Sequence, residues 1–268
     1  MSMQAIKYKE KNSNIDFKKL SLSELNKLPN HIGIIDFKIT KTSFLILNVL
    51  NDDSSAVKFF WHDTHDLESL DLWFDISKKE GLYIDVGAHT GLYTLTSLKS
   101  NPNNQILAIE PFYLNMARLI SNLRLNNFFK NIDTKIIAAS NQDGISRFNI
   151  GTHLSYLSKG GKIDEKGEKI NINKIDTITK DIKNKKIRGI KIDTEGEDYK
   201  VLLGAKKTIE IFRPKIIIEV RNQNKNKIQN FFSNAKYKLF DVSKIDKPIN
   251  LNEIEIPGVL NIFAEPIS

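Results

Sequence analysis

From Gly81 onward, short apolar strands alternate with amphipathic helices, and this alternation constrains the fold more than any other feature of the sequence. The run at 215–220 is almost continuously apolar, which is typical of a strand buried on both faces of a parallel sheet. Strands that alternate with helices predict an α/β domain with a mostly parallel sheet and helices on both faces. The expected strands are 82–86, 105–110, 135–139, 188–193, 215–220, 237–242 and 259–263.

The first 80 residues have a different pattern. Residues 32–38 and 43–50 are expected as a hairpin, and residues 57–61 as a third strand. Residues 66–79 have the apolar spacing of an amphipathic helix. We therefore predict a small β-rich and helical extension, residues 1–80, that packs on a main domain formed by residues 81–268.

The amino-acid composition excludes some kinds of site and makes some kinds of partner improbable. The 268 residues include no cysteine, which excludes disulfides and thiolate metal sites. The net charge of +8 comes from lysines scattered along the chain, so a nucleic-acid partner is not favoured. No apolar run approaches the roughly 18 residues that a membrane span needs, and the amino terminus is polar. These features predict a cytoplasmic protein without a membrane span, and they leave the oligomeric state open.

The most informative motif lies between residues 82–86 and the helix that follows. Asp85, Gly87 and Gly91 form the pattern Asp-x-Gly-x-x-x-Gly at a strand-to-helix turn. Glycines at such a turn let the backbone approach a ligand closely, and the helix start offers unpaired N–H groups. Glu110 ends the next strand, about 20 residues further on, where a carboxylate can hold both ribose hydroxyls of a nucleoside. The pattern therefore predicts a nucleoside-binding turn.

A second constellation surrounds the strand 188–193. Lys191 and Asp193 share one face of this strand, and a lysine on a covered face needs a carboxylate partner. Thr194 and Glu197 have the spacing of a capping box and are interpreted as structural. Glu219 ends the neighbouring strand beside Asp193, at the edge where open α/β sheets bind ligands. Two converging carboxylates indicate a general base or a metal site.

Four segments in this order resemble the FkbM family of S-adenosylmethionine-dependent methyltransferases. They are the glycine motif, Ile109-Glu110-Pro111, residues 190–196 with the sequence IKIDTEG, and Arg213-Pro214 followed by Ile218-Glu219. The resemblance implies a class I methyltransferase (Rossmann-like) fold with seven strands in the order 3-2-1-4-5-7-6. It also implies that Gly87 and Gly91 line the methionine moiety, that Asp85 holds its ammonium group and that Glu110 takes the ribose. The implied cofactor-binding residues are Asp85, Gly87, Ala88, His89, Gly91, Glu110, Ala139, Ser140 and Asn141, the last three beside the adenine.

The leading functional hypothesis is an O-methyltransferase for a hydroxyl of a sugar, glycan or small metabolite. Asp193 is the expected general base, with Glu219 and Lys191 as the other catalytic residues. A metal-free route is favoured over Mg²⁺ or Mn²⁺ held by Asp193 and Glu219, because only two ligands are in view. RNA methylation is the runner-up, although base-directed enzymes carry Asn/Asp-Pro-Pro-aromatic where this chain has Asp193-Thr-Glu-Gly. A non-catalytic S-adenosylmethionine-binding domain is the third hypothesis.

Residues that could hold the acceptor lie outside these motifs. The glycine-containing stretch 151–173 is expected as a long mobile loop that forms an acceptor-side wall. His153 and Tyr156 in this stretch, together with Glu195, are candidate acceptor-binding residues. His62, His65 and Asp66 resemble a metal-ligand cluster, but we interpret them as a polar loop because no fourth ligand is in view.

Overall fold

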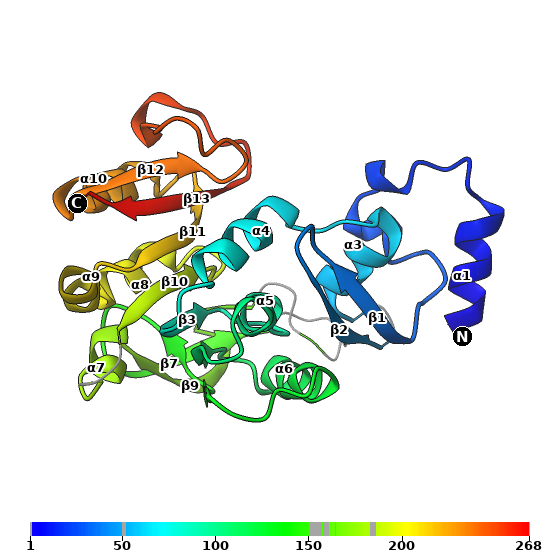
Figure 1. Cartoon of the computed structure of the whole chain (residues 1–268), viewed down its shortest axis with the longest axis horizontal. Coiled ribbons are helices and arrows are strands. Elements are labelled where there is room, and N and C mark those ends of the chain that lie inside the picture. The colour runs from blue at the N-terminus through cyan, green and yellow to red at the C-terminus, as the bar shows by residue number, and fades with distance from the viewer. Residues whose placement is uncertain are drawn as a thin grey trace.

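The computed structural model describes residues 2–49, 52–150, 157, 161–163, 165–182 and 186–267. Its main body is a seven-stranded sheet with the order β12-β13-β11-β10-β3-β4-β5 (Figure 1). Only β13 runs antiparallel to its neighbours within this sheet. When the seven strands are numbered along the chain and the sheet is read from β5 to β12, the order is 3-2-1-4-5-7-6. The predicted topology is therefore confirmed. The strands are β3 (Leu82–Val86), β4 (Gln105–Ile109), β5 (Ile132–Lys135), β10 (Ile187–Ile192), β11 (Lys215–Arg221), β12 (Tyr237–Asp241) and β13 (Val259–Pro266).

Helices cover both faces of the sheet. Apolar side chains of α4 (Leu67–Ile76), α5 (Leu92–Ser100) and α6 (Tyr113–Leu125) form one buried cluster with one face. Those of α7 (Ile175–Thr179), α8 (Asp198–Gly204), α9 (Lys206–Phe212) and α10 (Lys225–Asn234) form a second cluster with the other face. Two short helices, α8 and α9, follow one another after β10.

The strand period of two decides which residues face which helices. Ile190 and Ile192 of β10 lie in the cluster of α7–α10. Lys191, between them, faces the opposite side, where it pairs in register with Asp85 of β3. A lysine and an aspartate therefore lie side by side beneath α5, within an otherwise apolar face.

The N-terminal segment consists of α1 (Ser2–Lys11), η1 (Phe17–Lys19), α2 (Leu22–Leu25), the hairpin β1 (Gly33–Lys38) and β2 (Ser43–Asn48), and α3 (Ser54–His62). The hairpin is confirmed, but the strand expected over 57–61 is wrong because these residues belong to α3. Asp53 caps this helix by accepting hydrogen bonds from the N–H groups of Ser55 and Ala56. Phe59 joins the cluster of α4–α6, whereas Val57 and Trp61 join a third cluster within the N-terminal segment. A helix with apolar residues on two sides gives a sequence that is apolar except for Lys58, and such a sequence resembles a strand.

Hydrogen bonds fasten the N-terminal hairpin to α6. The backbone N–H groups of Leu45 and Leu47 donate to the side chains of Asn126 and Asn122. Arg118 forms an ion pair of 2.8 Å with the buried Asp52. These contacts hold the segment against the main sheet, while the division into domains at residue 80 stays a prediction.

Residues 138–173 contribute a second, four-stranded sheet. It contains β6 (Ala138–Ala139), β7 (Gly144–Asn149), β8 (Lys162–Ile163) and β9 (Glu168–Asn173) in the order β6-β9-β7-β8. The expected strand 135–139 is thus divided between β5 and β6. The expectation of a loop throughout 151–173 is wrong for β8 and β9, because their backbones pair with β7.

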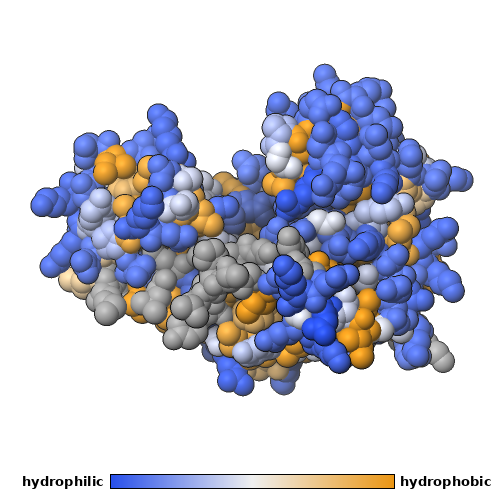
Figure 2. All heavy atoms as spheres, turned by 180° about the vertical axis from the view of Figure 1, so that it is seen from behind, coloured by the Kyte–Doolittle hydropathy of each residue, from blue (hydrophilic) through white to orange (hydrophobic). Residues whose placement is uncertain are grey.

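Seen from the side opposite to Figure 1, the surface is mainly hydrophilic, with apolar residues in several separate places (Figure 2). Within the described residues, no helix is long and apolar enough to cross a membrane. The remaining short element is η2 (Leu251–Glu253), which lies between β12 and β13.

Candidate functional site

A cavity of about 450 Å³ opens where the parallel strands β3, β4, β10 and β11 end. Its wall includes the turn between β3 and α5, the end of β4, the turn between β10 and α8, and Glu219 near the end of β11. The N-terminal segment contributes the start of α3, and the four-stranded sheet contributes Phe148 and Ile163. The cavity therefore lies at the carboxyl edge of the sheet, where α/β folds bind ligands.

The turn after β3 requires glycine at Gly87. This residue has a φ of +76°, and a Cβ there would lie 1.8 Å from the carbonyl oxygen of Asp193. The N–H groups of Gly87 and Ala88 both donate to the carbonyl of Ile109, at 2.9 and 3.0 Å. The turns after β3 and β10 can therefore approach each other only because Gly87 has no side chain.

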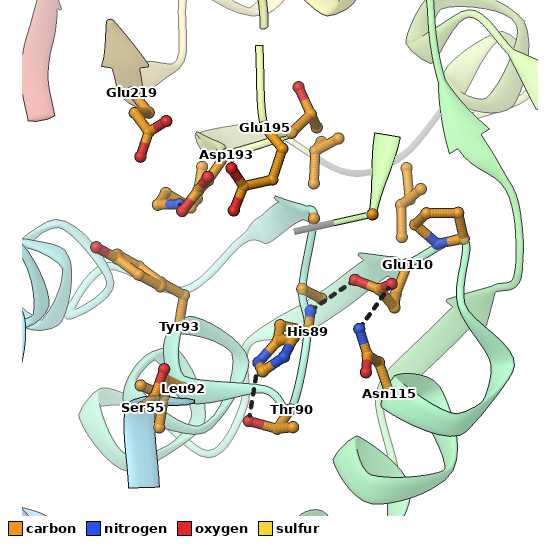
Figure 3. A pocket seen from close by; sticks show the side chains of 18 of the residues that line it. Ser55, His89, Thr90, Leu92, Tyr93, Glu110, Asn115, Asp193, Glu195 and Glu219 are labelled. Atoms are coloured by element: carbon orange, nitrogen blue, oxygen red, sulfur yellow. Dashed lines mark hydrogen bonds and ion pairs between the residues drawn. The ribbon is translucent and has the colours of Figure 1, made fainter. Parts of the chain in front are cut away.

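Glu110 is a buried carboxylate in the wall of this cavity (Figure 3). Its Oε2 accepts from the backbone N–H of His89 at 2.9 Å, and its Oε1 accepts from Phe112 N–H and Asn115 Nδ2. Burial raises the pKa of Glu110, and His89 together with these hydrogen bonds opposes the rise. Three donors thus fix the direction of a carboxylate that faces the cavity.

Asp85 does not line the cavity, although the family resemblance implied that it holds the ammonium group of the cofactor. It is buried and is not among the lining residues. The N–H and hydroxyl of Thr94 both donate to its Oδ2, at 3.0 and 2.7 Å. Burial raises the pKa of Asp85, and Lys191 and Thr94 oppose this effect. Asp85 therefore fastens α5 to β3, and its contact with a cofactor ammonium group stays a prediction.

Lys191 lies beneath the floor of the cavity and is almost completely buried. Its Nζ is 3.3 Å from Asp193 Oδ2 and 4.4 Å from the centre of the Tyr93 ring. Burial alone would lower the pKa of Lys191, but Asp193, Asp85 and Asp66 hold it above the ordinary value. The expected carboxylate partner is confirmed, and the ammonium group fixes the orientation of Asp193.

Tyr93 connects this ion pair to the N-terminal segment. Its hydroxyl donates to Asp66 Oδ2, and Asn261 of β13 donates to Asp66 Oδ1 at 3.2 Å. Burial and the neighbouring Asp66 raise the pKa of Tyr93 well above its ordinary value, so the phenol stays protonated. A chain of contacts therefore runs from Asp193 through Lys191 and Tyr93 to Asp66.

Glu219 and Glu195 lie on the same side of the cavity as Asp193 (Figure 3). Arg221 donates to both glutamates, at 2.7 Å to Glu219 and 2.8 Å to Glu195. Burial and the nearby Asp193 raise the pKa of Glu219 to about 7, although Arg221 opposes this effect. Burial and Asp193 also raise the pKa of Glu195. Asp193 and Glu219 lie together as the sequence suggested, and the structure adds Glu195 to them.

The turn that carries Asp193 and Glu195 is held by Asp198. This fully buried carboxylate accepts hydrogen bonds from Thr194 N–H, Thr194 Oγ1 and Gly196 N–H at 2.8, 3.0 and 3.1 Å. The predicted capping box of Thr194 and Glu197 is wrong, because Glu197 makes no side-chain cap. The capping carboxylate lies one residue further along the chain.

Most of the residues predicted from the sequence line the cavity. They are Gly87, Ala88, His89, Glu110, Ala139, Lys191, Asp193, Glu195 and Glu219. Gly91, Ser140 and Asn141 lie close in sequence to lining residues but are not among them. His153 and Tyr156 lie outside the described residues. Gly91 begins α5 with a φ of +94°, so its role in this structure is to start the helix.

The structure adds residues that the sequence interpretation missed. Ser54, Ser55 and Lys58 of α3 line the cavity, as do His65 and Asp66 of the following turn. Burial lowers the pKa of His65 to about 4, so the imidazole is neutral at pH 7. His62 instead contacts the carbonyl of Leu20 at 3.2 Å. In the described part of the chain, no group of three or more His, Cys, Asp or Glu side chains is arranged to hold a metal ion.

The strand order, the glycine turn after β3 and the carboxylate at the end of β4 define a class I methyltransferase architecture. The model of the methyltransferase FkbM domain matches residues 85–243, which is more than half of the chain. The chain therefore belongs to the FkbM methyltransferase family.

Solved structures with a similar fold include several methyltransferases. The methyltransferase FkbM of Methylobacillus flagellatus KT is 15% identical with a TM-score of 0.49, and the match covers 80% of this chain and 54% of that protein. The precorrin-6y C5,15-methyltransferase of Geobacter metallireducens GS-15 is 11% identical with a TM-score of 0.46, covering 76% and 90%. TYW2 of M. jannaschii, solved in complex with AdoMet, is 15% identical with a TM-score of 0.46, covering 90% of each chain. This chain thus spans about half the length of the Methylobacillus protein, and no functionally curated protein matches it significantly in sequence.

Proposed function

We propose that the protein is an S-adenosylmethionine-dependent O-methyltransferase that acts on a hydroxyl of a sugar, glycan or small metabolite. The observation that carries this proposal is the arrangement of Glu110 and Asp193 in one cavity at the carboxyl edge of the sheet. Glu110 is suited to a ribose, and Asp193 is suited to a hydroxyl proton. One pocket thus offers groups for both the cofactor and the acceptor.

The residues present fit the proposed cofactor. Three donors occupy three of the about four lone-pair sites of the Glu110 carboxylate, which leaves a site on Oε2 that can accept from a ribose hydroxyl. Pro111, Ala139, Phe148 and Ile163 offer apolar surface beside it for an adenine ring. Gly87, Ala88, His89 and Thr90 of the turn after β3 also line the cavity, so the methionine part can lie along this turn.

In the proposed reaction the protein has to position the two substrates and remove the proton of the acceptor hydroxyl. When bound, S-adenosylmethionine supplies an electrophilic methyl group on a sulfonium sulfur. Asp193 accepts the proton of the acceptor hydroxyl on one of its carboxylate oxygens. Lys191 keeps Asp193 in place through the 3.3 Å ion pair, and Tyr93 restricts the ammonium group from the other side. Glu219 supplies the second carboxylate at the acceptor.

The proposed route is free of metal. The carboxylates that a cation would need already have partners, because Lys191 pairs with Asp193 and Arg221 pairs with Glu219 and Glu195. A divalent cation would have to displace these partners. Methyl transfer that persists after exhaustive EDTA treatment is expected, and activity restored only by Mg²⁺ or Mn²⁺ would contradict this part of the proposal.

RNA methylation is the alternative within the same fold. Enzymes that methylate amino groups of bases use a proline and an aromatic residue after the fourth strand to grip a flipped base. This chain has Asp193-Thr194-Glu195-Gly196 at that point, in a turn held by Asp198. The absence of a stacking side chain in this turn favours a hydroxyl acceptor over a base.

A methyl-transfer screen tests the proposal. Radiolabelled S-adenosylmethionine would be incubated with sugar nucleotides, glycans, small hydroxylated metabolites and RNA. We expect methyl transfer to a hydroxylated acceptor. In Asp193→Asn, kcat should fall by a factor of about 10²–10⁴, the usual contribution of a general base to the rate. Asp133→Asn, which neutralises an exposed aspartate on β5, is the matched control.

The screen separates the proposal from its alternatives. Methyl transfer to RNA bases alone would favour the hypothesis of an RNA methyltransferase. Binding of S-adenosylmethionine without methyl transfer to any hydroxyl acceptor would favour the hypothesis of a non-catalytic binding domain. Equal activity in Asp193→Asn and wild type would remove the role of Asp193.

A further inference from the structure

The first turn of α3 carries a lysine into the cavity from the N-terminal segment. Ser54, Ser55 and Lys58 all line the cavity wall. Residues four apart lie on the same side of a helix, so Ser54 and Lys58 face the cavity one above the other. In the close view, Ser55 and Glu110 are drawn on opposite sides of His89 (Figure 3).

Lys58 differs from the other lysine of the cavity in having no partner. Lys191 forms an ion pair with Asp193, whereas Lys58 makes no ion pair or hydrogen bond within the described part of the chain. The acidic residues near it along the chain interact with other groups, since Asp63 pairs with Lys9 and Asp52 pairs with Arg118. Asp53 accepts from the N–H groups of Ser55 and Ala56, and Asp66 accepts from Tyr93 and Asn261.

Carboxylates outnumber lysines and arginines in the remaining described wall, where Lys191 is the one such cation. The described lining carries six carboxylates, which are Asp66, Glu110, Asp193, Glu195, Glu197 and Glu219. A carboxylate on a ligand would be repelled by this wall unless a cation faced it. S-adenosylmethionine has one carboxylate, at the end of its methionine part. Under the proposed function, that part follows the glycine turn toward Ser55.

We propose that Lys58, with the hydroxyls of Ser54 and Ser55, forms the subsite for the α-carboxylate of the cofactor. This inference rests on the proposed function, because it assumes that the cavity binds S-adenosylmethionine. The N–H groups of Ser55 and Ala56 are occupied by Asp53, so recognition depends on the side chains. An ammonium group and two hydroxyls can provide three charge-assisted hydrogen bonds to a carboxylate, one of them from a cation.

The position of Lys58 is fixed by the packing of α3. Val57 and Trp61 are buried in the N-terminal cluster, and Phe59 is buried against the main domain. The helix is therefore held on both sides, which keeps the base of the Lys58 side chain at the cavity wall. The N-terminal segment then serves to complete the cofactor site.

Calorimetry with two ligands tests this inference. The first ligand is S-adenosylhomocysteine, and the second is its decarboxylated analogue, which keeps the adenosine, the sulfur and the amino group. Wild type should bind S-adenosylhomocysteine about 10–100-fold more tightly than the analogue, as expected for a hydrogen bond to a charged group. Lys58→Met should lose this preference by weakening only the carboxylate-containing ligand, and Lys58→Arg should retain it.

Two controls keep the result interpretable. Lys238→Met removes an exposed lysine of β12 with the same change of charge, and its affinities should equal those of wild type. Lys58→Gln provides a second neutral variant if the methionine variant does not fold, and thermal melting monitors the fold of each protein.

The outcomes distinguish the inference from its competitors. Equal weakening of both ligands by Lys58→Met would overturn it, because the lysine would then act on another part of the ligand. Unchanged binding of S-adenosylhomocysteine with a raised KM for an anionic acceptor would overturn it in favour of an acceptor subsite. If wild type binds neither ligand, the proposed function fails and the inference fails with it. If wild type binds both ligands equally, only the inference fails.

Discussion

Replacement of Lys191 by methionine tests the interpretation of the buried ion pair. The methionine side chain has nearly the same length and volume, so the substitution removes the ammonium charge with little change in packing. Two carboxylates lose their compensating charge. Asp85 is 3% exposed and pairs in register with Lys191, and the Oδ2 of Asp193 lies 3.3 Å from the ammonium group.

The expected loss of stability follows from this burial. Breaking a buried ion pair by removing one partner costs about 3–5 kcal/mol, because a charge stays buried without compensation. Asp85 should account for most of this cost, since the side chain of Asp193 is 38% exposed and is partly hydrated. Urea unfolding at pH 7 measures the change in the free energy of unfolding, with Lys238→Met expected to stay within about 0.5 kcal/mol of wild type.

The loss should depend on pH with a definite sign. Without the ammonium group, the pKa of Asp85 in the folded state rises further above its ordinary value of 3.8. The folded state then binds more protons than the unfolded state, so the stability of the variant falls as the pH rises above the ordinary value. The difference from wild type should be greatest at pH 7 and should shrink toward pH 4. A difference below about 1 kcal/mol at pH 7, or one that does not change with pH, would refute this reasoning.

Two further predictions concern the acceptor side. Because burial and Asp193 raise the pKa of Glu219 to about 7, kcat should increase as the pH rises through 7, since only the ionised Glu219 supplies a second carboxylate at the acceptor. Glu219→Gln should remove this inflection from the pH profile of kcat, and a profile that keeps it would contradict the assignment. Asp198→Ala removes three hydrogen bonds to the turn after β10 and should lower the free energy of unfolding by about 2–4 kcal/mol, while Asp198→Asn should lose less. Urea unfolding checks this, and equal stability of Asp198→Ala and wild type would count against the capping role.

The parts of the fold that could be predicted are those with short-range signals. Strand β3 and the turn after it were recognisable because an apolar run ends in Asp85-x-Gly87-x-x-x-Gly91. The convergence of Asp193 and Glu219 followed from parallel strands that end at one edge. The pairing of Lys191 with a carboxylate followed from burial of a central strand.

The parts that could not be predicted depend on tertiary contacts. Residues 57–61 have β-branched and aromatic side chains, yet they form a helix because Asp53 caps it and two clusters bury opposite sides. Lys58 was missed as a result, since its direction depends on the helix. Asp198 displaced the expected capping box because the left-handed conformations of Glu195 and Gly196 alter the turn.

Binding of S-adenosylhomocysteine to wild type and to Glu110→Ala, measured by calorimetry, tests the central claim most directly. The account predicts that wild type binds the ligand and that Glu110→Ala binds it more weakly by about 1.5–3 kcal/mol, the range for hydrogen bonds to a charged group. Glu210→Ala, at an exposed position of α9, should bind like wild type. No binding by wild type, or equal binding by wild type and Glu110→Ala, would contradict the account.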